Sequence, residues 1–184
     1  MHPFKIHGDL VEWSPTGYMT IIGVDPGLSG AVAILTHVTD HDKLTEGNNS
    51  LDIFDMPVHH LKRGGKNKRE IDRYQLARLV EKCCPIDKAI VERVGAMPGQ
   101  GVSSMFQFGR AVGIIEGILA AMYIPTEYVA PRTWRSYFKV RAGKDSSRER
   151  ASALMPRSSE LWARKKDTGR ADAALIALYG VRAD

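Results

Sequence analysis

Three acidic residues stand where strands and helices would bring their side chains to one edge of a sheet. Asp25 ends the apolar run TIIGV, Glu92 ends the shorter run AIV, and Asp172 falls in the first turn of the last expected helix. Carboxylates gathered in a partly buried site stay ionised together only when a cation compensates them. Oxygen ligands without cysteine or paired histidine select Mg²⁺ or Mn²⁺ rather than zinc. The pattern predicts a site for a hard divalent metal ion.

The chemistry open to such a site is phosphodiester hydrolysis. Two divalent ions about 4 Å apart activate a water molecule and stabilise the leaving 3′-oxygen. Each acid taken alone also has a structural explanation: Asp25 could start a turn, while Asp172, or Asp167 in KKDTGRAD, could cap a helix and complement its dipole. Glu92 is hardest to explain structurally, because an acid directly after an apolar strand has little structural reason to be there.

Basic residues cluster in three segments of a chain that carries 26 lysines and arginines against 21 acids, with a net charge of +5 and a pI near 9.3. Such segments suit a polyanion, because phosphate contacts release condensed counterions. The alternative is an ordinary solvated surface, and the clustering favours nucleic acid. The segments contain, in order, Lys62, Arg63, Lys66, Lys68 and Arg69; then Arg132, Arg135, Lys139, Arg141, Lys144, Arg148 and Arg150; then Arg164, Lys165, Lys166 and Arg170.

Size and composition limit the class of protein. The 184 residues suffice for one domain with one core. We expect no membrane partner, because no apolar run approaches the length of a membrane span and the N-terminus does not resemble a signal peptide. The only cysteines, Cys83 and Cys84, are adjacent, which excludes a disulfide framework or a zinc site. We expect a reducing compartment, the cytoplasm of a bacterium or phage-infected host, with an organellar matrix as the alternative.

Apolar runs bounded by turn residues predict strands, and apolar residues at helical spacing predict helices. The expected strands are 20–24, 30–38, 51–56, 88–91 and 125–129. The expected helices are 72–84 with Asp72 as N-cap, a long helix from 103, then 131–138, 146–155, 158–163 and 171–179. The basic segment 62–69 is expected to be a flexible loop. Three consecutive strands followed by alternating helices and strands predict an α/β fold with a mixed five-stranded sheet flanked by helices. Residues 1–18 are expected to be an appendage and 19–184 the domain.

Four blocks of the sequence, in order, resemble the RuvC group of Holliday-junction resolvases, which have an RNase H-like fold. IIGVDPGLSGAVAIL is similar to the family's first strand and hairpin, and VERVGAMPGQGVSSMFQFGRAVGIIEGIL is similar to its second acidic motif with the following helix. KKDTGRADAALIALYG resembles its C-terminal acidic helix. GGKNKREID, PRTW and AGKDSSRERASALMP resemble the phage and organellar branch. The resemblance runs from about residue 20 to 180.

The resemblance implies a Mg²⁺-dependent, structure-selective DNA endonuclease that cuts four-way junctions in symmetric pairs as a homodimer, with Mn²⁺ as a possible substitute and two ions per site. It assigns metal binding and catalysis to Asp25, Glu92 and Asp172. The family places an acid or histidine three residues before the last aspartate, where this chain has Gly169. Asp167, five residues before it, is the candidate for the fourth ligand.

Contacts to DNA are expected from basic residues and from the start of the long helix, where backbone N–H groups suit phosphate. Phe106 and Phe108 point about 200° apart on a helix, so both cannot face the core. Phe108 fits the apolar stripe, which leaves Phe106 to stack on an unpaired base or to pack under a loop. The expected DNA-contact residues are Lys62, Arg63, Lys66, Lys68, Arg69, Gln100, Phe106, Gln107, Arg110, Arg132, Lys144, Lys165 and Lys166.

Gly109, Gly113 and Gly117 form one small-residue face on the long helix. This face could admit a partner subunit, or it could let the helix lie closely on its own sheet, and we expect the second. Other functions are also open. DPGLSGAVAIL resembles the phosphate-binding hairpin of actin- and hexokinase-like phosphotransferases, although 184 residues leave no room for their second lobe. A non-catalytic nucleic-acid-binding protein and an RNA-processing nuclease on the same fold are the remaining alternatives.

Overall fold

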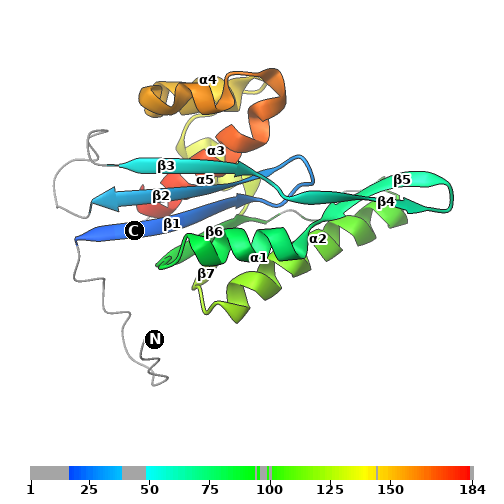
Figure 1. Cartoon of the computed structure of the whole chain (residues 1–184). Coiled ribbons are helices and arrows are strands. Elements are labelled where there is room, and N and C mark those ends of the chain that lie inside the picture. The colour runs from blue at the N-terminus through cyan, green and yellow to red at the C-terminus, as the bar shows by residue number, and fades with distance from the viewer. Residues whose placement is uncertain are drawn as a thin grey trace.

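The centre of the protein is a sheet of five strands: β1 (Tyr18–Asp25), β2 (Ala31–Val38), β3 (Ser50–Asp55), β6 (Lys88–Glu92) and β7 (Thr126–Val129). Their order across the sheet is β3-β2-β1-β6-β7 (Figure 1). The computed structural model describes residues 17–38, 49–93, 95, 99, 101–143 and 145–182. The mixed five-stranded sheet expected from the sequence is confirmed.

Strand direction brings two of the predicted acids to one edge of this sheet. β1, β2 and β3 pair in antiparallel fashion, whereas β6 runs parallel to β1, and β7 runs parallel to β6. Val24 of β1 pairs with Val91 of β6, and the next residues along the two strands are Asp25 and Glu92. Because parallel strands end at the same edge, both carboxylates belong to one side of the sheet.

Helices cover both faces of the sheet, with α1 and α2 on one face and α3, α4 and α5 on the other (Figure 1). Alternation along β1 supplies both cores: Ile21 packs with α5, while Ile22 and Val24 pack with α1 and α2. The helices are α1 (Arg73–Lys82), α2 (Val102–Ala121), α3 (Pro131–Tyr137), α4 (Ser146–Leu154) and α5 (Thr168–Arg182), with 3-10 turns η2 (Pro156–Trp162) and η3 (Lys165–Asp167).

The start of α1 follows the sequence prediction. Oδ1 of Asp72 accepts hydrogen bonds from the backbone N–H groups of Tyr74 and Gln75, each at 3.1 Å. Such a cap satisfies N–H groups that have no partner within the helix. Leu76 and Val80 are the buried residues of the helix, one turn apart. The predicted N-cap is confirmed.

The basic segment 62–69 forms part of a two-stranded ribbon, so the expectation of a flexible loop was wrong. The ribbon pairs β4 (Val58–Arg63) with β5 (Lys66–Ile71) in antiparallel register. Gly64 and Gly65 form its two-residue turn, with φ of 58° and 71°. A turn with positive φ at both central residues matches the twist of a hairpin, and glycine adopts it without steric cost.

The base of the ribbon is fixed to α2 by a short ion pair. Arg110 Nη1 lies 2.6 Å from Glu70 Oε2, and the Glu70 side chain is only 5% exposed. Ile71, the next residue of β5, is buried in the core beneath α1 and α2. Arg110 was expected to contact DNA, and the structure gives its guanidinium group a partner within the protein. The ribbon therefore extends from the domain on a fixed base.

The glycine face of α2 does not lie on the sheet, contrary to expectation. Gly109, Gly113 and Gly117 are exposed, and a Cβ atom added to any of them would meet no atom within 4 Å. The buried face of α2 consists instead of Ala111, Ile115 and Leu119. The three glycines thus form an open strip along the helix.

The predicted division at residue 19 falls within β1, where Met19 is 8% exposed and belongs to the core. Residues 1–16 lie outside the described residues, so the appendage remains a prediction. Among the helices that the structure describes, none has the length and apolar character required to cross a membrane.

Candidate active site

Three carboxylates from three elements influence one another at the edge of the sheet. Asp25 ends β1, Glu92 ends β6, and Asp172 lies in the first turns of α5, which packs against β1. The charges of Glu92 and Asp172 both raise the pKa of Asp25, and the charge of Asp172 also raises the pKa of Glu92. Because such effects weaken with distance, the three carboxylates share one site.

Asp25 has the most perturbed carboxyl group of the three. Burial raises its pKa to about 7, the charge of Glu92 adds to the rise, and a hydrogen bond from the Gly27 backbone N–H opposes it. That N–H lies 3.3 Å from Asp25 Oδ1. A carboxyl group in this state is half protonated near neutral pH, so a cation that stabilises its charged form is strongly favoured.

Glu92 is held by a buried tryptophan. The indole Nε1–H of Trp134 donates a 2.8 Å hydrogen bond to Glu92 Oε1, and the side chain of Trp134 is fully buried. Burial raises the pKa of Glu92, while the hydrogen bond from Trp134 lowers it. The indole therefore fixes one carboxylate oxygen of Glu92 and leaves Oε2 for another partner.

Asp172 is held less completely by residues of α3 and α4. Arg135 Nη1 lies 3.9 Å from Asp172 Oδ1, and Arg135 Nη2 donates a 3.2 Å hydrogen bond to the Ser147 hydroxyl. Burial raises the pKa of Asp172, while a hydrogen bond with Ser147 and the charge of Arg135 lower it. Oδ1 of Asp172 is buried without a hydrogen-bond partner among the described residues. A buried carboxylate oxygen in this state needs a donor or a cation.

The donor set fits a hard divalent ion. All three side chains offer carboxylate oxygen, and burial raises all three pKa values. Neighbouring carboxylates raise the pKa values of Asp25 and Glu92 further, and Asp172 Oδ1 has no hydrogen-bond partner within the described part of the chain. No three acidic, histidine or cysteine side chains of the described residues already stand in metal-binding geometry.

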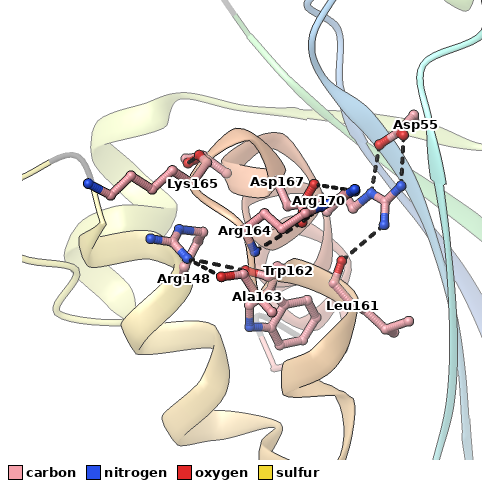
Figure 2. A network of polar contacts seen from close by, with 10 residues as sticks. Asp55, Arg148, Leu161, Trp162, Ala163, Arg164, Lys165, Asp167 and Arg170 are labelled. Atoms are coloured by element: carbon pink, nitrogen blue, oxygen red, sulfur yellow. Dashed lines mark hydrogen bonds and ion pairs between the residues drawn. The ribbon is translucent and has the colours of Figure 1, made fainter.

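Asp167 belongs to a different network (Figure 2). The Arg164 side chain donates to both of its carboxylate oxygens at 2.9 Å, and the Arg164 backbone N–H donates to Oδ2 at 3.1 Å. The hydrogen bond from Arg164 lowers the pKa of Asp167. Arg170 binds Asp55 of β3 in the same bidentate way, at 2.6 and 2.7 Å. Asp167 is thus compensated within the protein, and its role as a fourth metal ligand stays a prediction.

Gly169 occupies the position where the resemblance places a fourth ligand. A Cβ atom added there would lie 2.6 Å from the Ser29 carbonyl oxygen and 3.1 Å from Asp25 Oδ2. This position therefore faces Asp25, but a side chain there would collide with the backbone of the turn that follows β1. Close packing of α5 on that turn explains why only glycine fits.

The expected DNA-contact residues divide into exposed and internally bound groups. Phe106 is 70% exposed, which confirms that it does not belong to the core. The side chains of Arg63 and Lys66, together with Gln100 and Lys144, lie outside the described part of the structure. The exposed expected residues are Lys62, Lys68, Arg69, Phe106, Arg132, Lys165 and Lys166; Gln107 is partly buried.

Several other arginines of the basic segments, which the sequence indicated for a polyanion-binding surface, bind partners within the protein instead. Arg148 donates to the carbonyl oxygens of Trp162 and Ala163, and Arg170 donates to that of Leu161 (Figure 2). Arg150 donates to the Phe138 carbonyl oxygen. These arginines join α4 to the end of α3 and to η2, and α5 to η2, so the basic surface is smaller than the sequence indicates.

Sequence reasoning missed Trp134, Arg135 and Ser147 as partners of the acids. A topological pattern could have indicated the first two. β7 runs parallel to β6, so the helix directly after β7 begins at the edge where Glu92 lies. Pro131 marks that helix start, and Trp134 and Arg135 follow within one turn. Ser147 depends on how α4 packs, which no local pattern indicates.

Solved structures of other proteins have the same fold. The chain matches RuvC of Thermus thermophilus with a TM-score of 0.56 and 12% identity, over 90% of this chain and 97% of that one. It matches the same protein in complex with a Holliday junction substrate with a TM-score of 0.55 and 12% identity, over 89% and 96%. The yeast mitochondrial Holliday junction resolvase Ydc2 matches with a TM-score of 0.52 and 14% identity, over 86% of this chain and 76% of that one. No protein-family model matches the sequence, and no curated protein matches it. The RNase H-like fold of RuvC, expected from the resemblance, is confirmed.

Proposed function

We propose that the protein is a Mg²⁺-dependent endonuclease that resolves four-way DNA junctions by paired symmetric hydrolysis of phosphodiester bonds. The observation that carries this proposal is the gathering of three carboxylates with raised pKa values, two at the ends of β1 and β6 and one in the first turns of α5. They lie on a fold shared with RuvC, which has been solved with a Holliday junction substrate, and with the resolvase Ydc2.

Each residue of the site has a role in this proposal. Asp25, Glu92 and Asp172 would hold two Mg²⁺ ions, for which Mn²⁺ could substitute. When bound, such ions activate a water molecule and stabilise the leaving 3′-oxygen of a phosphodiester. Trp134 keeps Glu92 oriented through its oxygen Oε1. Arg135 lies beside Asp172 and moderates the negative charge of the site.

The DNA would lie along the exposed basic residues and the start of α2. The ribbon presents Lys62, Lys68 and Arg69 to solvent from a base fixed on α2. Lys165 and Lys166 are exposed just before Asp167, and exposed Phe106 is available to stack on an unpaired base. The open glycine strip on α2 supports a homodimer, because helices without side chains at the contact can approach closely. A dimer would present two such sites for symmetric nicks.

Cleavage of defined substrates tests the function. The protein should nick a synthetic four-way junction in the presence of Mg²⁺ and leave the matched duplex and an RNA–DNA hybrid uncut. Asp25→Asn, Glu92→Gln and Asp172→Asn should each lower junction cleavage by about a thousandfold or more and retain junction binding. Preferential cleavage of the hybrid would favour the RNA-processing alternative. Binding without cleavage by the parent protein would favour the non-catalytic one.

Salt dependence tests the basic ribbon separately from the chemistry. Replacing Lys66, Lys68 and Arg69 with alanine should weaken junction binding and flatten the slope of log K against log salt by up to about three units, because each phosphate contact contributes roughly 0.9. The melting temperature should change little, because Lys68 and Arg69 are exposed and exposed substitutions usually cost less than about 0.5 kcal/mol. An unchanged affinity and slope would remove the ribbon from the DNA-binding surface.

A further inference from the structure

An open pocket of about 480 Å³ lies between the ribbon and the start of α2. Its volume falls within the range of roughly 300–1,000 Å³ that is usual for small-molecule sites. Lys68 and Arg69 line it from β5, and Ser104, Gln107 and Phe108 line it from α2. Figure 1 shows the ribbon extending beside the beginning of this helix. Neither the candidate metal site nor the phosphate contacts of the proposed function require a hollow here.

The lining combines an apolar floor with a polar rim. Leu28, Phe108 and Ala111 supply apolar surface, and Phe108 also offers an aromatic ring. Gln107 carries an amide group that both donates and accepts hydrogen bonds, as the edge of a nucleobase requires. A ligand that is flat and apolar on its faces and polar at its edges matches this arrangement.

The same pocket contains a cation for a phosphate group. Side chains alternate along β5, so exposed Lys68 lies on the face of Glu70, which binds Arg110 of α2, whereas Arg69 lies on the opposite face. Gly101, which precedes α2, has no side chain to cap the helix. The N–H of Ser104 donates to the Gly101 carbonyl oxygen, which leaves the N–H groups of Val102 and Ser103 for an anion. Base-like and phosphate-like chemistry within one pocket indicates a nucleotide rather than a free base or a simple anion.

The pocket also adjoins the candidate active site. Leu28 stands three residues after Asp25, in a turn closed by a hydrogen bond of 2.9 Å from the Gly30 N–H to the Gly27 carbonyl oxygen. A second hydrogen bond joins the Gly27 N–H to the Asp25 carboxylate. One short turn thus carries a wall of the pocket and a catalytic carboxylate. A nucleotide in the pocket would lie on DNA whose backbone continues to Asp25.

We propose that this pocket receives one unpaired nucleotide, extruded from the branch point of the DNA next to the bond that is cut. This inference rests on the proposed function and names how the site distinguishes branched from duplex DNA. Extruding a paired base costs free energy for unstacking and unpairing, and a base at a branch point costs less. The pocket therefore favours junctions even where phosphate contacts are the same.

The experiment fills the pocket without changing its charge. Ser104→Trp places an indole in it, and Ala153→Trp places the same side chain at an exposed position of α4, on the other face of the sheet and outside the lining. Both are made in the Asp25→Asn background, which prevents cleavage. Binding is measured with four-way junctions that carry 2-aminopurine at successive positions around the branch point, and with the matched duplex. Melting temperatures of all variants establish that they fold.

When the protein that carries only Asp25→Asn binds the junction, the fluorescence of 2-aminopurine should increase at one position near the branch point. Ser104→Trp should lose that increase, weaken junction binding at least tenfold and leave duplex binding and the salt slope unchanged. Ala153→Trp should match the protein that carries Asp25→Asn alone. As a second variant, Gln107→Leu should reduce the difference in junction affinity between junctions that carry different bases at that position.

Two results would contradict the proposal that the pocket receives a nucleotide and would leave the proposed function intact. One is tight junction binding without a fluorescence change at any position. The other is full affinity and full fluorescence increase in a folded Ser104→Trp protein. If no branched DNA binds in preference to duplex in any background, the proposed function fails and this inference fails with it.

Discussion

Two sets of carboxylates near the start of α5 differ in what compensates them. Asp167 and Asp55 are each bound by an arginine in bidentate geometry, and these hydrogen bonds hold their pKa values below the ordinary range (Figure 2). Asp25, Glu92 and Asp172 have raised pKa values, with burial as the largest cause. The first set is neutralised within the fold and stabilises it. The second set opposes folding unless a cation binds, which is the property of a functional site.

The pH dependence of stability should separate the two sets most strongly. Since Asp25 has its pKa raised from 3.8 to about 7, its contribution to the free energy of unfolding is present at low pH and is lost as pH rises through about 7. Without divalent metal, the parent should lose stability between pH 5 and 8 relative to Asp25→Asn, by an upper bound of about 3 kcal/mol. Urea unfolding in a chelator measures the difference, and a gap that does not vary with pH would contradict the raised pKa.

Much of this arrangement follows from local sequence. The runs TIIGV and AIV are apolar because β1 and β6 lie in the middle of the sheet, and the acid at the end of each run indicated the site edge. The basic ribbon was mistaken for a loop because its strands are exposed and polar and lack alternation, although Gly64-Gly65 is a typical two-residue hairpin turn.

Other features depend on contacts that no local pattern specifies. The partner of Asp167 is Arg164, three residues away, and they meet only because η3 forms a tight turn between them. The glycine strip of α2 has the same composition whether it faces the sheet or solvent, so its exposure could not be read from spacing.

Replacing Asp167 should damage the fold and spare the metal site. Asp167→Asn removes a bidentate ion pair with Arg164 from a side chain that is 5% exposed, whereas Arg164 is 57% exposed and regains water. We expect a loss of about 2 kcal/mol in the free energy of unfolding, measured by urea titration with Mg²⁺ absent. Arg164→Ala is the matched variant, and it should cause a similar loss. A variant of normal stability that no longer cleaves junctions would instead identify Asp167 as a fourth ligand.

The Trp134 hydrogen bond should matter for cleavage more than for folding. Trp134→Phe retains an aromatic ring in a fully buried position and removes only the donor to Glu92 Oε1. We expect about a tenfold loss of junction cleavage, the lower end of what supporting hydrogen bonds contribute at metal sites. The loss should shrink as the Mg²⁺ concentration rises, whereas a packing defect would persist. Cleavage rates across a Mg²⁺ titration, with melting temperatures beside them, decide between the two.

Calorimetric titration of Mg²⁺ tests the central claim, that the uncompensated carboxylates form the metal site, without relying on any DNA substrate. The parent protein and Asp167→Asn should bind Mg²⁺ with similar affinity at pH 8. Glu92→Gln and Asp172→Asn should bind it at least tenfold more weakly, while unfolding at no lower temperature than the parent in a chelator. Unchanged Mg²⁺ binding by folded Glu92→Gln and Asp172→Asn proteins would contradict the account.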